Sequence, residues 1–332
     1  MSESDICVTR VHLKTDTPKR EQLIDYCLHS RAERGTQYIA VGWSCVYELE
    51  DGTVAKPDSA EAFFTLYDQW RRRYRKRTDH VINVFSETLP GDLFWTRDLD
   101  GCYWICRATG TALPLLDEEL DIGIVIPVDA YPVGHEVPGQ VRASFNRPRG
   151  GTSESFHDKM LVEYSKHVYN QCSNCSAYTV ERQSGGDLIS NLPALELEEL
   201  VITYLQLEKD LYVLSNSIAS KSTSIKAECE LLSRTNPGER AVVQVKGGSS
   251  HTLYASEFQS FVDAGTTVYL KAPVVILDVA SPLVVEITNE QLQAFYAANK
   301  QLLPHSITRW KNLFTWPITY STRSGFHRQA NE

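Results

Sequence analysis

Apolar and polar positions follow two different rhythms along this chain, and together they predict an α/β protein. The stretches 7–14 and 240–247 read as strands, in which successive side chains point to opposite faces. The stretch 58–77 has apolar residues at helical spacing and predicts an amphipathic helix opened by Asp58–Ser59. Both patterns recur to the end of the chain, so strands and helices are expected in both halves.

The first half of the chain predicts a mixed set of elements. We expect strands at 7–14, 37–49 and 122–131, helices at 20–32 and 58–77, and a hairpin of 91–97 and 101–110 that turns across Asp98–Gly101. The segment 147–155, RPRGGTSES, is rich in residues that break regular structure. We therefore expect one domain at 1–155, a linker at 156–190 and a second domain at 191–332.

The second half has a clear order of elements. The pattern predicts a helix at 197–206, strands at 211–217, 225–232 and 240–247, a helix at 254–264, a strand at 266–272, short strands at 274–279 and 283–288, and a helix at 289–302. An order of helix, three strands, helix and strand implies an α/β core with a mixed sheet flanked by helices.

The stretch 225–248, IKAECELLSRTNPGERAVVQVKGG, carries the strongest chemical signal. It reads as two strands joined at Asn236–Pro237, and pairing that is symmetric about this turn places Glu228 opposite Gln244 and Lys246 within about one residue. On one strand face this gathers a carboxylate, an amide oxygen and an ammonium group. Such a set suits Mg²⁺-dependent cleavage of a phosphodiester, and the simpler alternative is an edge hairpin whose polar residues face water.

Each residue of this set has an expected role. Glu228 and Gln244 supply oxygen ligands for Mg²⁺, with Mn²⁺ as an alternative ion. Lys246 orients the attacking water or neutralises charge that develops on the phosphate. A fourth group can come from the preceding helix, where Glu198 or Glu199 could face the sheet.

This order of elements, with an acid on the second strand and QVK on the third, resembles the PD-(D/E)xK restriction-endonuclease fold over residues 190–272. Glutamine in place of the acid is similar to the Mrr-like branch. The resemblance implies a Mg²⁺-dependent endodeoxyribonuclease, a hydrolase, with the catalytic residues Glu198, Glu228, Gln244 and Lys246. The chain departs from the family in having Glu228 where Asp is usual, with Glu230 as a competing assignment. The neutral Gln244 implies weaker Mg²⁺ binding than an all-carboxylate site.

The segment 38–110, with YIAVGW and LPGDLFWTRDLDGCYWICRATG, resembles the EVE branch of PUA-like domains, a relative of the YTH fold. VPGQVRASFNRPRGG at 137–151 resembles the closing segment of that domain in modification-dependent nucleases, so the match covers most of residues 5–150. The resemblance implies a β-barrel with helices and a pocket for one extruded, modified base. Aromatic faces would stack on that base. The candidate base-binding residues are Trp43, Phe85, Trp95 and Trp104, each with core packing as the alternative; the candidate phosphate contacts are Arg97, Arg142 and Arg147.

Composition narrows the picture further. The net charge of −9 argues against a general DNA coat protein, although the basic run 71–77 could contact phosphate or end a solvated helix. The chain has no apolar run long enough for a membrane span and no signal-like start, so we expect a cytoplasmic protein with reduced cysteines. Cys172 and Cys175 have the spacing found in one half of a four-ligand zinc site, with His157 and His167 as the nearest further ligands. The alternative is that they are reduced cysteines in an exposed linker.

The sequence as a whole predicts a modification-dependent, type IV-like DNA endonuclease with two domains. Its base flipping and anti-phage host-defence role follow from the resemblance. A single active site cuts one strand at a time, so double-strand cleavage implies a homodimer or two copies bound to the same DNA. The alternatives are a non-catalytic reader of modified DNA that keeps a degenerate nuclease scaffold, and a reader of modified RNA.

Overall fold

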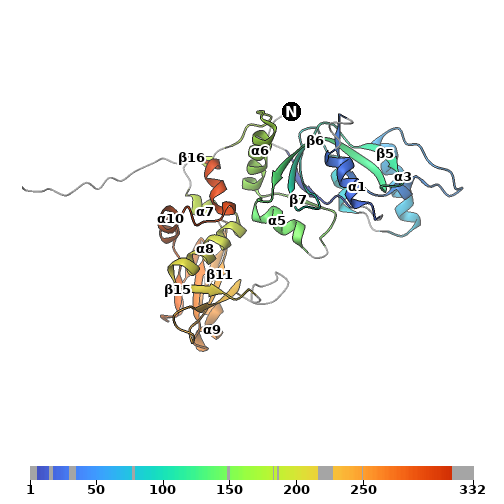
Figure 1. The fold of residues 1–332 in the computed structure, drawn as a ribbon. Helices are drawn as coiled ribbons and strands as arrows, with labels where there is room; N and C mark the ends of the chain where they lie inside the picture. Colours follow the sequence, from blue (N-terminus) through green and yellow to red (C-terminus); the bar gives the residue numbers. More distant parts are fainter. Residues whose placement is uncertain are drawn as a thin grey trace, which may run out of the picture.

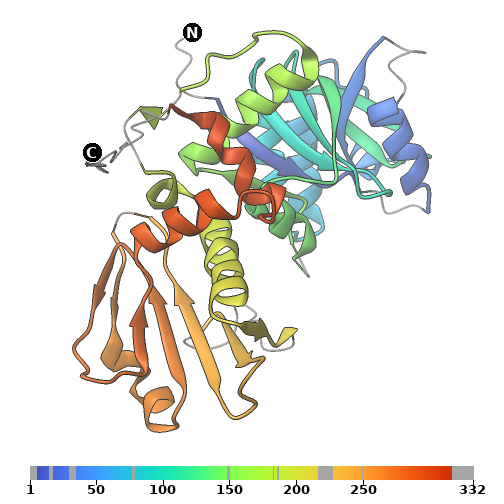
Figure 2. The same ribbon diagram turned by 60° about the vertical axis from the view of Figure 1, so that its left-hand side comes forward.

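A computed structural model describes residues 6–14, 18–29, 35–76, 79–147, 150–181, 183–184, 187–215, 227–248 and 250–315. The fold is mixed α/β, as the sequence predicts. Two separate sheets, each covered by helices, occupy opposite ends of the molecule in Figures 1 and 2, and further helices lie at their junction.

The first sheet is curled into a half-barrel. Its strands are β1 (Val8–Val11), β2 (Gln37–Val41), β3 (Leu93–Arg97), β4 (Tyr103–Ala108), β5 (Leu113–Asp117), β6 (Ile122–Gly134) and β7 (Ser153–Phe156). Their order is β2-β6-β4-β3-β1-β7, and β5 pairs with β6. The long strand β6 pairs with three others and bends the sheet, whereas β1 and β3 run parallel. The antiparallel pairing of β3 and β4 confirms the predicted hairpin.

Apolar side chains project from both faces of this sheet, because successive residues of its strands are apolar and point to opposite faces. Helices cover both faces. One face is covered by α1 (Arg20–Ile24), the π-helical η1 (Asp25–His29), the 3₁₀ turn η2 (Ser44–Tyr47), α3 (Ala60–Arg73) and α4 (His80–Glu87). The other is covered by α5 (Gly139–Asn146) and α6 (Lys159–Ser173). Ser59 caps α3 by accepting a hydrogen bond from the Ala62 amide at 3.2 Å, as expected from the sequence.

The segment expected to be a linker, 156–190, is largely ordered instead. It contains α6, the short strand β8 (Gln183–Ser184) and α7 (Leu188–Asn191). Met160, Leu161 and Tyr164 of α6 are buried in the core shared with β3 and β4. Their helical spacing provides an apolar face, so the sheet holds this segment as a structural layer rather than leaving it as a connection.

The second sheet has the predicted order of elements. Its strands are β9 (Leu211–Val213), β10 (Cys229–Ser233), β11 (Arg240–Val245), β13 (Thr267–Lys271) and β15 (Val284–Glu286), in the order β15-β13-β11-β10-β9. The helix α8 (Ala194–Glu208) packs on one face, and η4 (Ala255–Phe258) with α9 (Gln259–Asp263) packs on the other. Strands β12 (Thr252–Tyr254) and β14 (Val274–Ile276) form a small separate pair.

The two halves share one hydrophobic core. The last described elements are α10 (Asn289–Ala298), α11 (His305–Thr308), η5 (Arg309–Leu313) and β16 (Phe314–Thr315). Trp310 is fully buried, with its ring 4.9 Å from that of Tyr164 on α6, so the C-terminal helices pack onto the first half. None of the helices that the structure describes has the length and apolar character needed to cross a membrane.

Candidate functional site

The β10–β11 hairpin has the register that the sequence predicts. Cys229 pairs with Val243, and the Glu228 amide donates to the Val243 carbonyl at 2.8 Å. The Glu228 amide and Cys229 therefore both lie beside Val243, so the regular pairing ends at Cys229 and Glu228 is the residue just before the strand. From this position the Glu228 carboxylate meets the Gln244 amide.

Three predicted side chains converge at this point. Gln244 Nε2 donates to Glu228 Oε1 at 2.7 Å, and Lys246 Nζ lies 3.9 Å from the same oxygen. Gln244 is buried, Glu228 is 22% exposed and Lys246 is 44% exposed. Solvent exposure therefore increases across the group: the Gln244 amide is buried, the Glu228 carboxylate is partly exposed, and the Lys246 ammonium is accessible. Charge interactions are stronger at such a partly desolvated position than in bulk water.

Glu228 Oε1 accepts a hydrogen bond from Gln244 and forms an ion pair with Lys246, and a cation could bind at this oxygen. In its present orientation the Gln244 amide nitrogen also contacts the Val245 carbonyl at 3.2 Å. Rotation of the amide by half a turn would direct its oxygen to the same point, since an amide offers a donor on one side and an acceptor on the other. Glu228 and Gln244 thus provide two oxygen ligands of the kind that Mg²⁺ accepts.

Glu198 approaches this group from the other face of the sheet. Its helix, α8, packs on the face that holds Val243 and Val245, and Gln244 alternates with these residues. Burial raises the pKa of the Cys229 thiol to about 11, and the charges of Glu228 and Glu198 add to the effect. Both carboxylates therefore lie within electrostatic range of one thiol, while direct contact joins Glu228, Gln244 and Lys246. Glu199 is exposed.

The structure separates Glu228 from its competitor Glu230. Glu230 lies opposite Val242, is exposed, and has its carboxylate 3.7 Å from the Arg240 guanidinium. Within the described ranges, no group of three or more His, Cys, Asp or Glu side chains is placed to hold a metal ion. An ion at this site would therefore depend on amide or carbonyl oxygens in addition to carboxylates.

The end of β11 is anchored against the first turn of α8. A Cβ atom on Gly247 would lie 3.2 Å from the Cα of Ala194, a tight contact, so a larger residue here would require the two backbones to move slightly apart. Gly248 follows with a φ of +84°, in the left-handed region. The two glycines after Lys246 thus fix where the strand ends and where its last side chain points.

Two of the expected base-stacking residues are core residues. Trp95 is fully buried and its Nε1 donates to Ser165 Oγ at 2.9 Å, and Phe85 is buried on the opposite side of the sheet. The expectation that they stack on a base is therefore wrong, because helices cover both faces of their part of the sheet. Trp104 is also largely buried, with its Nε1 donating to Asp98 Oδ2 at 2.9 Å.

Trp43 is different, because it is partly exposed and held in an unusual backbone conformation. Its φ of 71° lies in the left-handed region, which disfavours a residue with a large side chain. Asp121 fixes the turn by accepting from Ser44 N at 3.1 Å and from Ser44 Oγ at 2.7 Å. A Cβ on Gly123 would lie 2.7 Å from the Trp43 carbonyl, so the turn also depends on that glycine. The surrounding structure thus orients one indole, which lies 5.1 Å from the Tyr67 ring.

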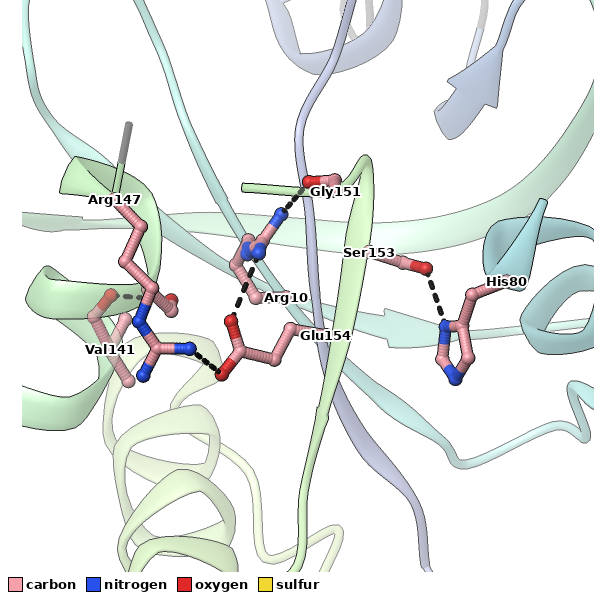
Figure 3. A network of polar contacts seen from close by, with 8 residues as sticks. Arg10, His80, Val141, Arg147, Gly151, Ser153 and Glu154 are labelled. Atoms are coloured by element: carbon pink, nitrogen blue, oxygen red, sulfur yellow. Dashed lines mark hydrogen bonds and ion pairs between the residues drawn. The ribbon is translucent and has the colours of Figure 1, made fainter. Parts of the chain in front are cut away.

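The three expected phosphate contacts differ in their surroundings. Arg147 donates to Glu154 at 2.8 Å, and Figure 3 shows Glu154 between Arg147 and the buried Arg10, which donates to it at 3.1 Å. Arg97 is half-buried and donates to Asn146 Oδ1 at 2.8 Å, so its partner there is neutral. Arg142 is exposed on α5.

The basic run 71–77 is partly neutralised by acids. Asp68 accepts from Arg71 at 2.5 Å and from Arg72 at 2.6 Å, and Arg73 lies 3.8 Å from Glu50. The last residue of the run lies outside the described residues. These ion pairs reduce the charge available to a phosphate, and they favour the solvated helix end over the phosphate contact.

Several residues near the expected phosphate contacts are not among the candidates named from the sequence. Arg10, His12 and Lys14 alternate along the first strand, a period-two pattern that would have placed three basic side chains on one face. Glu154 carries no local signal, since its pairing depends on β7 meeting β1 across the sheet. Cys172 and Cys175 are free thiols.

No family model, no curated protein and no solved structure matches this chain.

Proposed function

We propose that this chain is a Mg²⁺-dependent DNA endonuclease of the PD-(D/E)xK type, in its QxK form, which acts on DNA carrying a modified base. The observation that carries the proposal is the contact of Glu228 with both Gln244 and Lys246 at the end of a β-hairpin. The order α8, β9, β10, β11, α9 and β13 around it also supports the proposal.

The residues at this site suit phosphodiester hydrolysis. Bound Mg²⁺ would polarise the phosphate and lower the pKa of a coordinated water. Glu228 and Gln244 hold the ion, and Lys246, accessible at the rim, orients water and offsets negative charge on the phosphate as it is attacked. Glu198, on α8 at the other face of the sheet, shares with Glu228 an electrostatic effect on Cys229, so its assistance is the least supported part of the proposal.

The first half would supply the recognition of the base in an EVE/PUA-like manner. Trp43 is partly exposed, and its turn is fixed by Asp121 and Gly123. A rigidly oriented indole is suited to stack on an extruded base, an interaction worth roughly 1–3 kcal/mol. Of the candidates named from the sequence, Trp43 is therefore kept as the proposed stacking residue, and Trp95 and Phe85 are not.

A cleavage assay tests the nuclease proposal. Supercoiled plasmids with and without modified bases are incubated with the protein and Mg²⁺, and nicked product is measured over time. Lys246→Ala and Glu228→Gln are each expected to lower the cleavage rate about a hundredfold, since each removes a charge at the reacting phosphate. Glu230→Gln is the matched control, because it makes the same change two residues away on the same strand and should leave the rate unaltered.

A non-catalytic reader is the second candidate, and one observation favours it. The Gln244 amide and the Glu228 carboxylate satisfy each other through a hydrogen bond, so the site is stable without an ion. Tight binding of modified plasmid with no cleavage by the unaltered protein would support this reader over the nuclease. Competition between DNA and RNA oligonucleotides that carry the same modified base identifies the nucleic acid that is read.

A further inference from the structure

A group of basic side chains gathers around Phe145, apart from the candidate nuclease site. It comprises Arg10, His12, Lys14, Arg20 and Arg97, which come from β1 and the residues after it, from α1 and from β3. The Arg97 and Arg10 guanidinium groups lie 5.3 and 5.7 Å from the centre of the Phe145 ring. The His12 ring meets the same phenyl group edge-on at 4.8 Å.

The backbone explains why these side chains lie together. Arg10 pairs with Trp95 in the parallel register of β1 and β3, so two residues further on His12 comes beside Arg97. Arg10, His12 and Lys14 alternate along the chain and therefore share one face. Phe145, near the end of α5, packs against that face and keeps the guanidinium groups apart from one another.

The charge on part of this group is not offset by acids. Arg97 donates to Asn146 Oδ1 at 2.8 Å and Tyr103 Oη at 3.3 Å, and Arg20 donates to the Leu13 carbonyl at 3.2 Å. All three acceptors are neutral. In the part of the chain that the structure describes, no ion pair engages Lys14, Arg20 or Arg97.

His12 reports the resulting positive field. Its pKa is lowered to about 3, first by burial and then by the charges of Arg10, Lys14, Arg20 and Arg97. Only cations contribute to this charge effect, in a protein whose net charge is −9. A local excess of positive charge on an acidic protein attracts polyanions selectively to that place.

The basic run at the end of α3 provides a useful contrast. There, Arg71 and Arg72 are paired with Asp68, whereas Lys14 and Arg20 are exposed and Arg97 is half-buried with neutral partners. The α3 run has more basic residues, but Arg71 and Arg72 share the carboxylate of Asp68, whereas the hydrogen-bond acceptors of Arg20 and Arg97 are neutral.

We propose, on the basis of the function proposed above, that Lys14, Arg20 and Arg97 bind the phosphodiester backbone of the nucleic acid. Arg97 is held in place by Tyr103 and Asn146, and the two exposed side chains extend the surface along the backbone. Phosphate contacts of this kind position a nucleic acid without reading its sequence.

The surface formed by Lys14, Arg20 and Arg97 is linked to the candidate nuclease site by α5, which agrees with a role in binding the same nucleic acid. α5 has eight residues, about 12 Å at 1.5 Å per residue. Asn146 at its end contacts Arg97, and the Gly139 amide at its start donates to Glu196 of α8 at 2.6 Å. One short helix thus joins the basic surface to the helix that packs beneath the candidate active site.

Binding measured without cleavage tests this proposal. Fluorescence anisotropy of a labelled DNA duplex is followed in EDTA over a series of salt concentrations. Lys14→Gln/Arg20→Gln should weaken binding about tenfold or more, and should lower the slope of log affinity against log salt by about 1–2, since about 0.9 counterions are released per phosphate contact. Arg97→Gln should add a further loss.

The control has the same change of charge in the competing region. Arg71→Gln/Arg72→Gln, at two positions whose guanidinium groups are paired with Asp68, should leave both the affinity and the slope nearly unchanged. Equal losses in both double variants, or an unchanged slope in Lys14→Gln/Arg20→Gln, would overturn the proposal. Loss of binding in that variant supports it even where the unaltered protein cuts no DNA, and cleavage that persists with unaltered binding refutes this surface alone.

Discussion

At the scale of single residues, we predict opposite roles for Trp43 and Trp95 despite their shared chemistry. We expect Trp43→Ala to weaken binding of DNA with an extruded base by roughly 1–3 kcal/mol, the value of one stacking contact, and also to lower stability, because the indole packs on Tyr67. Trp95→Phe should lower the free energy of unfolding by about 1–3 kcal/mol, because it empties volume in the core and leaves Ser165 Oγ without its donor. Anisotropy and chemical denaturation measure the two effects.

The same pair of variants provides its own control. Trp95→Phe is expected to lower stability and leave the binding of the folded protein unaltered, whereas Trp43→Ala is expected to weaken binding even under conditions where the variant is fully folded. Weakened binding in Trp95→Phe at equal stability would contradict the assignment of Trp95 to the core, and unaltered binding in Trp43→Ala would remove the proposed stacking residue.

The sequence was sufficient to predict that Glu228 and Gln244 lie together, but it was insufficient to predict which tryptophans are buried in the core. Glu228 and Gln244 could be brought together because a short hairpin fixes its register locally, and symmetry about Asn236 places them within about one residue of each other. The tryptophans could not be sorted, because strand alternation does not show whether a helix covers a face. Trp95 is buried by α6, an element that the sequence assigned to a linker.

At the scale of elements, the contact between α5 and α8 depends on a buried acid. Glu196 is 1% exposed, accepts from the Gly139 amide at 2.6 Å, and has no hydrogen-bond partner for Oε2 among the described residues. Burial raises its pKa to about 7; Asp158 adds to the rise, while the Gly139 hydrogen bond and Arg309 oppose it. The protonated form is therefore favoured in the folded protein relative to the unfolded chain.

This shift predicts how stability changes with pH. A carboxyl whose pKa is raised on folding contributes full stability below the unfolded value near 4.5, and the contribution is lost as pH rises through the folded value near 7. We expect Glu196→Gln to be more stable than the unaltered protein at pH 8 by up to roughly 3 kcal/mol, and nearly equal at pH 4.5. Denaturation at several pH values measures the difference.

Comparing Glu196→Gln with the unaltered protein at each pH isolates the contribution of Glu196, because all other side chains are the same in both proteins. His305 lies 2.8 Å from Glu136 at the same junction, and it is present in both proteins. A difference in stability that is the same at pH 4.5 and pH 8 would show that Glu196 is not protonated on folding.

Some elements could be read from the sequence and others could not. Strands β3, β4, β10 and β11 and the cap of α3 followed from local patterns of alternation and capping. Strand β7 is short, polar and preceded by breakers, and it forms because β1 offers a free edge far away in the sequence. Pairing over such a distance depends on the whole fold and leaves little trace in four residues.

At the scale of the whole molecule, one core crosses from the first half to the second. Trp310 packs on Tyr164, and Arg309 donates to Tyr164 Oη at 2.9 Å and to the Glu136 carbonyl at 3.1 Å. We therefore expect a single cooperative unfolding transition in calorimetry. Trp310→Ala should lower the free energy of unfolding of the entire molecule by about 3–5 kcal/mol.

Two separate transitions in the unaltered protein would contradict this expectation, as would a Trp310→Ala variant that loses only one half of the fold. Lys311→Ala, at an exposed position next in the chain, is the matched control and should leave the transition unchanged. The predicted boundary near residue 155 recognised a break in local pattern, but a shared core is a property of contacts that no local pattern records.

The joined core has a consequence for where DNA would be cut. Two modules on a loose tether sample many separations, so their products would have ragged lengths. The packing of the two halves on one another holds Trp43 and Glu228 at a fixed separation, so under the proposed function the fold would set a constant distance between the bound base and the cut. Breaks should then fall at a constant number of nucleotides from the altered base, whatever the sequence between them.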